Sequence, residues 1–400
     1  GGAKAVAYTQ QLQLAIIFGG MLAAGYFMVS ALPDGIGFGE ALSLGGVSGK
    51  LNVITTGFTP DGFDWKDRYN LVSGTIGGLF LALSYFGTDQ SQVGRYLTAK
   101  STTESRMGLL LNGLVKIPMQ FSILLLGALL FVFYQFNASP VFFNRAVEEK
   151  ALQTPYRDSL TQLKTRFDTL QFDQLAQSKW YLQAPRPSLK DSIRQQQTQI
   201  DFLRKDYKRI LAKASPGADT NDTNYIFLRY VVDQLPTGLV GLLIAIIFLA
   251  AWGSIAAALN SLASCTMIDF HQRFSTGMGQ EQAYTWSKGY TFLWGVFCII
   301  TAQFASGLGS LIEAVNVLGS LFYGVILGIF LAAFYVPFVK GRAVFWAAVL
   351  GELGVIALFL LDRYGYLGLG FLWLNVAGAL LVLVLALLFQ FYLSSLGKKQ

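Results

Sequence analysis

Long apolar runs separated by shorter polar segments dominate the chain. A bilayer core takes about 20 apolar residues per helix, whereas a membrane strand shows ~10 residues of alternating polarity. Runs of this length satisfy their backbone hydrogen bonds in lipid only as helices, so the pattern predicts an all-α integral membrane protein. Eight candidate spans cover residues 12–32, 71–87, 107–136, 235–268, 289–312, 314–339, 344–361 and 367–393.

A polar segment interrupts this pattern and divides the chain into residues 1–136, 137–234 and 235–400. Apolar residues within the middle segment recur at spacings of three and four, which is typical of one helix face. Pro185-Arg186-Pro187 between two such runs is a helix stop. We predict an amphipathic helical hairpin, and the alternative is a partly disordered, charge-rich insertion. The two runs are Leu160, Leu163, Phe167, Leu170 and Ile200, Leu203, Tyr207, Ile210.

The composition excludes a water-soluble protein. Charged residues make up 13% of the chain, about half the ~25% of an ordinary globular protein. They are concentrated in residues 144–222, which hold 14 Lys or Arg and 10 Asp or Glu. The remainder has too few polar side chains to cover a soluble surface, which excludes a soluble enzyme and a nucleic-acid binder. The formal charge of +7 does not indicate nucleic-acid binding, because the basic residues lie in loops between apolar runs.

The chain has only two cysteine residues and one histidine. Cys265 and Cys298 fall inside apolar segments and make neither a disulfide framework nor a CxxC site. His271 is the single histidine, so this chain offers no histidine-based metal site or triad. The sequence shows no signal peptide and begins at Gly1 without a methionine, so we interpret it as a piece of a longer protein.

The basic residues of the short loops predict the orientation in the membrane. With Gly1 on the cytoplasmic side, the inside segments hold ten basic residues and the outside loops hold four. The positive-inside rule favours this arrangement, which places residues 137–234 outside and both ends of the chain in the cytoplasm. The inside residues are Lys4, Arg95, Lys100, Arg106, Arg273, Lys288, Lys340, Arg342, Lys398 and Lys399; the outside residues are Lys50, Lys66, Arg68 and Arg363.

A lysine near the middle of the third span is a candidate binding residue. Lys116 would cost at least ~2.5–3.5 kcal/mol at the bilayer centre unless it faces a cavity or a partner. Pro118, two residues later, removes a backbone donor and is expected to open the helix locally. We therefore expect Lys116 to line a transport cavity, and the alternative is a structural pair with a carboxylate such as Asp89.

Glycines and small residues mark three further helices. Gly74, Gly77 and Gly78 in the second span are typical of a discontinuous helix at a transporter binding site. Residues 250–261 of the fourth span permit close packing, and Ser254 with nearby carbonyls could instead offer oxygens to an alkali cation. Gly324 and Gly328 form a GxxxG pair that predicts close approach of a neighbouring helix.

Four stretches resemble the sodium:solute symporter family. They are Gly1–Val6, Gly87–Leu97, Ala258–Ser264 continuing to Phe270, and Leu311–Phe322, in the order of the family. The resemblance implies a LeuT-like fold of two inverted five-helix repeats. The chain would hold helix five of the first repeat, the whole second repeat and two C-terminal helices.

The resemblance also assigns site residues. The substrate-site aromatic residue falls on Tyr85, with Phe86 beside it, before the motif Thr88-Asp89-Gln90. The substrate-site lysine falls on Lys116, and the substrate-contacting glutamine is replaced by Asn316. The main sodium site falls on the Ala250 carbonyl and on Gly253-Ser254, where the family has two serines. Gln10 occupies the place of an aspartate that some members use for a further cation.

The resulting hypothesis is a secondary active transporter that couples sodium entry to uptake of a small organic solute. A family member that is uncoupled from sodium and a transporter-like sensor or scaffold are the alternatives. An enzyme is not expected, because the chain has one histidine, no GxSxG and no Walker loop. Sodium is the expected coupling ion and no other cofactor is implied. The expected partners are the solute, the bilayer of the plasma (inner) membrane and N-terminal helices of the same protein.

Overall fold

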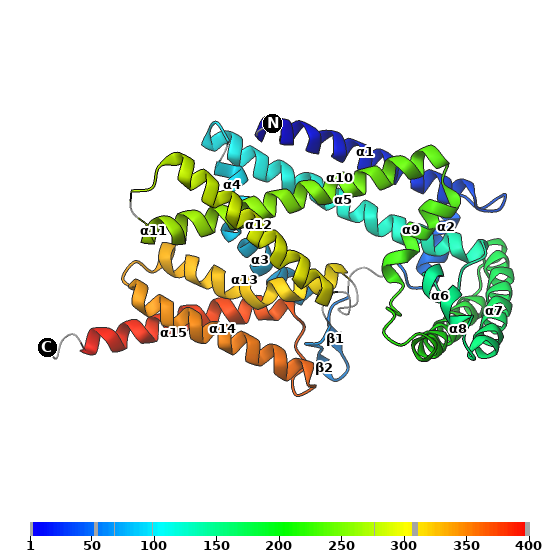
Figure 1. Ribbon diagram of the computed structural model, residues 1–400. Helices are drawn as coiled ribbons and strands as arrows, with labels where there is room; N and C mark the ends of the chain where they lie inside the picture. The colour runs from blue at the N-terminus through cyan, green and yellow to red at the C-terminus, as the bar shows by residue number, and fades with distance from the viewer. Residues whose placement is uncertain are drawn as a thin grey trace. The chain divides into compact units, whose positions relative to one another are not determined.

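The computed structural model describes residues 3–51, 55–67, 69–97, 99–275, 277–305 and 311–396, which form mainly helices (Figure 1). The chain divides into unit 1, residues 1–52 and 112–310, and unit 2, residues 53–111 and 311–400. Gly1, Gly2, Arg68, Lys398 and Lys399 lie outside the described residues, as do the side chains of Lys4, Gln10 and Arg95.

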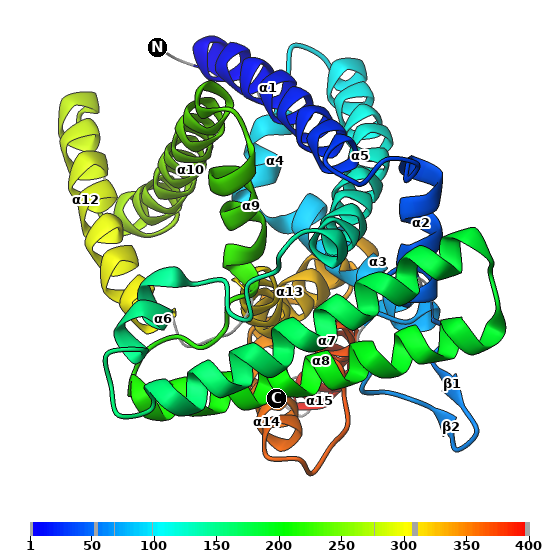
Figure 2. The same cartoon turned by 90° about the vertical axis from the view of Figure 1, so that its right-hand side faces the viewer.

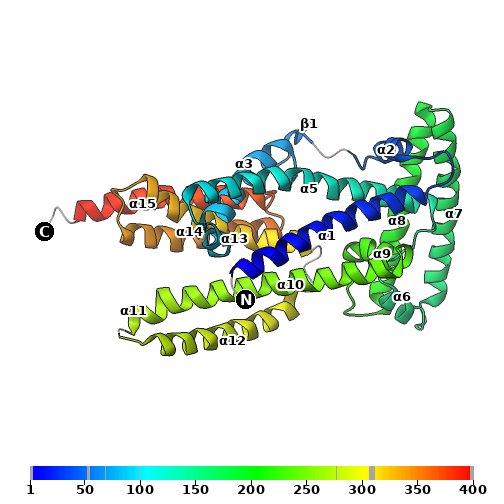
Figure 3. The ribbon, with the colours of Figure 1, turned by 90° about the horizontal axis from the view of Figure 1, so that it is seen from above.

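Unit 1 carries the first span, most of the third, the polar segment, the fourth span and most of the predicted fifth span. Its helices are α1 (Ala3–Ser30), α2 (Phe38–Val47), α5 (Thr102–Phe136, which enters the unit at Asn112), α6 (Arg145–Ala151), α7 (Arg157–Gln183), α8 (Pro187–Ala214), η1 (Thr223–Tyr225), α9 (Ile226–Gln234), α10 (Thr237–Cys265), η2 (Thr266–His271), α11 (Gln272–Phe274) and α12 (Gln280–Ala305). Helices α10 and α12 lie side by side (Figure 3).

Unit 2 combines the second span with the last three. It contains a small antiparallel pair of strands, β1 (Phe58–Thr59) and β2 (Gly62–Phe63), which the sequence pattern did not predict. Its helices are α3 (Leu71–Thr88), α4 (Gln90–Leu97), α13 (Leu311–Tyr335), α14 (Gly341–Arg363) and α15 (Leu372–Leu396).

Seven helices of the described chain are long and apolar enough to cross a membrane, which agrees with a multi-pass membrane protein. They correspond to seven of the eight predicted spans. The eighth prediction, residues 289–312, falls on α12, which is not among the seven; part of that range lies beyond the described residues. The polar residues Gln280, Glu281 and Lys288 at the start of α12 lower its apolar character.

Helices α13 and α15 approach each other closely through the predicted glycine pair (Figure 1). A Cβ atom at Gly324 would lie 2.5 Å from the carbonyl oxygen of Asn375. A Cβ atom at Gly328 would lie 2.7 Å from Val382 Cβ and 2.9 Å from the Ala379 carbonyl oxygen. The two helices therefore touch backbone to backbone, as the GxxxG pattern predicts.

The glycines of α3 do not interrupt the helix, so the prediction of a break within this glycine-rich span is wrong. Instead, α3 runs without a break from Leu71 to Thr88. A Cβ atom at Gly77 would lie 2.8 Å from Leu372 Cβ and 3.0 Å from the Leu372 carbonyl oxygen. This glycine thus lets α3 pack against α15. The chain leaves the helical conformation only at Asp89.

Two antiparallel helices, α7 and α8, form a hairpin within the polar segment (Figure 2). Leu160, Phe167, Ile200 and Tyr207 share a buried apolar cluster, and all four belong to the runs spaced by three and four. The Tyr207 hydroxyl donates a hydrogen bond to Glu148 Oε1 at 2.7 Å. Burial and this bond raise the pKa of Tyr207 above its ordinary value, because both favour the neutral hydroxyl.

A buried carboxylate ties α8 to the loops on either side of the hairpin. Asp222 is almost fully buried and accepts hydrogen bonds from the Phe143 N–H at 2.9 Å and from Arg204 at 3.2 Å. It also pairs with Lys208, and Arg204 donates to the Val141 carbonyl oxygen at 3.2 Å. Removing one partner of such a buried pair leaves uncompensated charge and is strongly destabilising. Asp222 therefore holds the hairpin to the loop that follows α5.

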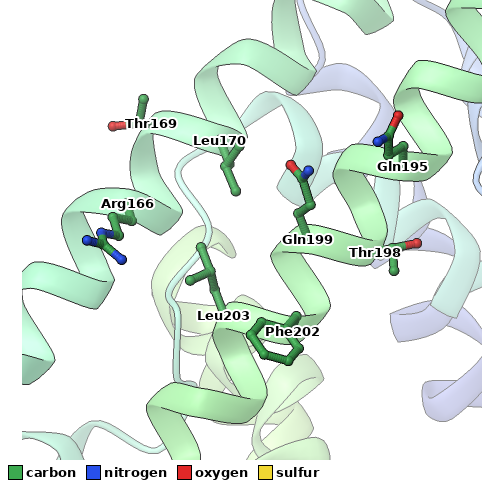
Figure 4. Close-up of a pocket in the computed structure, with 8 residues that line it drawn as sticks. All are labelled: Arg166, Thr169, Leu170, Gln195, Thr198, Gln199, Phe202 and Leu203. Carbon is green, nitrogen blue, oxygen red and sulfur yellow. The ribbon is translucent and has the colours of Figure 1, made fainter.

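A groove lies along the hairpin and is lined by side chains of α7 and α8 (Figure 4). It has a volume of about 810 Å³, and the side chains of Leu170 and Leu203 lie between its two helices. Its other lining residues are Arg166, Thr169, Gln195, Thr198, Gln199 and Phe202.

The close contact at Gly328 leads to a stability prediction. Gly328→Ala inserts a methyl group into backbone contact, and overpacking of this kind typically costs ~1–3 kcal/mol. We expect a lower midpoint of thermal unfolding for the detergent-solubilised protein. Gly78→Ala is the matched control, because a Cβ atom there meets no heavy atom within 4 Å and alanine favours helix by ~1 kcal/mol. Equal midpoints for the two variants would contradict the packing described for α13 and α15.

Candidate functional site

The break between α3 and α4 brings the predicted motif together. Asp89 adopts an extended conformation, with φ −72° and ψ 119°, and separates the two helices by a single residue. Its side chain caps the start of α4, because Oδ1 accepts hydrogen bonds from the Ser91 N–H at 2.8 Å and the Ser91 hydroxyl at 2.5 Å. The first motif residue, Thr88, donates to the Ser84 carbonyl oxygen at 2.8 Å, and Gln90 is exposed at the start of α4.

Tyr323 of α13 joins this motif, although no sequence motif pointed to it. Its hydroxyl donates a hydrogen bond to Asp89 Oδ2 at 3.4 Å. Its carbonyl oxygen accepts a hydrogen bond from the buried Ser84 hydroxyl at 2.6 Å. Two polar contacts therefore fix the end of α3 to the middle of α13.

Aromatic rings surround the same junction. The ring centroids of Tyr85 and Tyr323 are 6.4 Å apart, and Phe86 packs edge-on against Tyr85 at 5.0 Å. Gln92 of α4 donates to the Tyr85 hydroxyl at 2.7 Å, which holds α4 against the last turn of α3. The structure thus gathers Tyr85, Phe86 and Asp89 in one half-buried cluster with Tyr323.

Asn316 lies on the same helix as Tyr323. The two residues are seven positions apart, so they share one face of α13 at ~10 Å along the axis. Asn316 is half-buried. This spacing is the signal that could have identified Tyr323 from the sequence, once Asn316 had been assigned to the site.

The remaining predicted residues belong to unit 1. Lys116 lies on α5 with its side chain exposed, and α5 continues through Pro118 without interruption. Ala250, Gly253 and Ser254 lie within the unbroken helix α10. A Cβ atom at Gly253 meets no heavy atom within 4 Å, and Ser254 is exposed. The proximity of Lys116 to Tyr85 and Asn316 stays a prediction.

A wide turn follows the predicted sodium helix. Residues Thr266–His271 form a π-helical turn, η2, a feature that often marks functional segments. The His271 ring Nδ1 is 2.6 Å from the Tyr290 hydroxyl of α12, and Trp294 Nε1 donates to Thr266 Oγ1 at 2.9 Å. The sequence pattern did not predict this turn, because its residues fit an ordinary helix equally well.

The side-chain and backbone groups of the described residues determine which metal ions they could bind. Among the described residues, no group of three His, Cys, Asp or Glu side chains is arranged to bind a metal ion. An alkali ion is held instead by several neutral carbonyl and hydroxyl oxygens. The Ala250 carbonyl and the Ser254 hydroxyl are oxygens of this type, and sodium binding at these positions stays a prediction.

Comparison with known proteins identifies relatives of the chain. Residues 200–351 match the model of the Sodium:solute symporter family. The chain is 31% identical over 169 residues to the sodium/sialic acid symporter NanT of Aliivibrio fischeri, covering 42% of this chain and 32% of that protein. It is 24% identical over 341 residues to the sodium-dependent multivitamin transporter of Oryctolagus cuniculus, covering 84% of this chain and 40% of that protein. The predicted resemblance to the family is confirmed, and these relatives are transporters rather than enzymes.

A solved structure has a similar fold. It is a Na+-coupled sialic acid symporter in a substrate-bound, outward-open state, with a TM-score of 0.61 and 21% sequence identity. The match covers 98% of this chain and 62% of the other. The prediction of an all-α, LeuT-like fold is confirmed. The chain spans about a third of the length of the sialic acid symporters that it matches in sequence.

Two substitutions of Asp89 distinguish the stabilising effect of its helix cap from the effect of its negative charge. Asp89→Asn keeps an oxygen for the Ser91 N–H, so we expect little change in thermal stability. Asp89→Ala removes the cap and should destabilise the protein by ~0.5–2 kcal/mol. Thermal unfolding of both variants in detergent measures this difference. Equal destabilisation by Asn and Ala would show that the negative charge, rather than the cap, stabilises the junction.

Proposed function

We propose that this chain, as a relative of the sodium:solute symporters, belongs to a secondary active transporter that couples sodium entry to uptake of a small organic solute. The observation that carries the proposal is the cluster of Tyr85, Asp89 and Tyr323 at a helix break, in a chain whose residues 200–351 match the family. In lipid, irregular backbone is tolerated where it is buried in protein or lines a cavity, and broken helices mark transporter binding sites.

Each proposed site residue has a distinct role. Tyr85 and Phe86 offer aromatic surface to the solute, and Asn316 offers an amide that both donates and accepts hydrogen bonds. Lys116 supplies a positive charge or a donor. The Ala250 carbonyl and the Ser254 hydroxyl bind sodium, with Gly253 leaving one hydroxyl fewer than a serine pair provides. This missing hydroxyl favours a second candidate, a transporter that is uncoupled from sodium.

Uptake by the full-length protein in proteoliposomes tests the proposal. Sugars, amino acids and carboxylates are supplied with and without an inward sodium gradient. Uptake that depends on the gradient supports coupled transport. Uptake that ignores the gradient favours the uncoupled alternative, and absence of uptake for every class would favour a sensor or scaffold.

The first prediction for this function concerns Lys116. Lys116→Leu makes α5 more apolar, so membrane insertion should be preserved. A hydrogen bond to a charged group contributes ~1.5–3 kcal/mol, so loss of a solute contact should reduce uptake by ~10-fold or more. Uptake is normalised to the amount of protein in the membrane. Normal uptake by this variant would show that the lysine is structural.

The second concerns the sodium site. Gly253→Ser adds a hydroxyl where a Cβ atom meets open space, so it should increase the apparent sodium affinity. Ser254→Ala removes a ligand, and a contact of ~1.4 kcal/mol corresponds to a tenfold loss of affinity. The sodium dependence of uptake is measured for the wild type and both variants. Three coincident curves would exclude both positions from the sodium site.

The third concerns topology. We place residues 137–234 outside the plasma (inner) membrane and both ends of the chain in the cytoplasm, because the short loops have ten basic residues inside and four outside. Lys179→Cys, at an exposed position of α7, is introduced after replacing Cys265 and Cys298 by alanine. An impermeant maleimide should label this cysteine in intact cells. Labelling only after the cells are opened would reverse the proposed orientation.

A further inference from the structure

A second cavity of unit 1 lies between the end of α5, the hairpin and α9. Its volume is about 330 Å³, within the ~300–1,000 Å³ of small-molecule sites. It shares no lining residue with the proposed transport site, and unit 1 alone supplies its walls.

Four glutamine side chains give this cavity its polar character: Gln135, Gln171, Gln174 and Gln197. Gln174 Nε2 donates to Gln197 Oε1 at 3.1 Å across the hairpin, which orients both amides. Gln135 is 8% exposed, and its Nε2 donates to the Ser48 hydroxyl at 3.1 Å. Its Oε1 accepts no hydrogen bond from the part of the chain that the structure describes.

The charge of the cavity wall is already balanced. Arg204 is the charged residue that lines it, and this guanidinium is held by Asp222 and by the Val141 carbonyl oxygen. An anionic or cationic ligand would therefore find no unpaired counter-charge in the described wall, which favours an uncharged ligand.

Aromatic rings supply much of the apolar part of the wall, beside Leu130, Ile200 and Ile226. Phe131, Tyr134, Phe143 and Phe227 line the cavity together with the glutamines. A sugar ring combines apolar C–H faces with hydroxyl groups that both donate and accept hydrogen bonds. Aromatic faces suit the former, and amide groups, which also donate and accept, suit the latter.

We propose that this cavity is an accessory binding site for an uncharged polyhydroxylated molecule of about the size of a monosaccharide. Binding at this site is separate from solute transport. Its location on the outer side of the membrane rests on the proposed topology, but binding by the purified protein does not.

Filling the cavity from one wall tests the proposal. Gly127 lines the cavity, and a Cβ atom there meets no heavy atom within 4 Å, so Gly127→Leu places a side chain in the open space. Gly113→Leu makes the same change on the same helix, away from the cavity, and is the control. Binding of glucose, galactose, N-acetylglucosamine and glucuronate to the full-length protein in detergent is measured by saturation-transfer NMR and calorimetry.

We expect at least one of the uncharged sugars to bind at least tenfold more tightly than glucuronate. The affinity for this sugar should fall at least tenfold in Gly127→Leu but not in Gly113→Leu. Gln171→Leu removes a half-buried amide and should weaken binding in the same way. This variant replaces Gly127→Leu as the test if Gly127→Leu does not fold. Asn316→Ala separates the two sites, because it alters the transport site and should leave this binding unchanged.

Three results would overturn the proposal. They are absence of binding for every uncharged sugar, retention of binding in both cavity variants, and loss of binding in Asn316→Ala. The last result would assign the sugar to the transport site, which would leave the proposed transport function intact. Absence of sodium-dependent uptake with binding retained would contradict the transport function alone.

Discussion

A helix that ends within a membrane protein must find partners for its last carbonyl groups and for the first N–H groups of the next helix. Lipid offers none, so side chains have to supply them. At the junction of α3 and α4, Asp89 meets part of this requirement by accepting a hydrogen bond from the Ser91 N–H, and the Ser84 hydroxyl ties α3 to the Tyr323 carbonyl oxygen of α13. The residues that resemble the family motif are those that make the break possible. Polar and aromatic groups therefore gather where the helix stops.

The sequence was sufficient to predict elements whose signal is local. Apolar runs located the membrane helices, and the three-and-four spacing around Phe167 and Tyr207 located the hairpin. The GxxxG pair predicted the close contact of α13 with α15, because two glycines four residues apart leave a flat helix face.

Other features depend on partners that are distant in the chain. Gly77 could interrupt its own helix or allow another helix to pack closely against it. Only the position of Leu372 shows that it allows close packing. Tyr323 looks like an ordinary aromatic residue of an apolar helix until Asp89, 234 positions earlier, is placed beside its hydroxyl. The structural role of Asp222 likewise depends on its contacts with Phe143 and Arg204. Composition and periodicity carry no information about such pairs, so the helices could be predicted but the contacts between them could not.

The glycine contacts also have a mechanical consequence. Helices that meet through side chains can slide as rotamers change, but α13 and α15 meet through backbone atoms at Gly324 and Gly328, which have no rotamers to exchange. Backbone atoms thus hold α13 against α15, and α3 joins them through the contact of Gly77 with Leu372 and the hydrogen bond of Ser84. The three helices therefore have little freedom to slide past one another, and the chain changes direction at the single extended residue Asp89, where Gln92 ties α4 to α3.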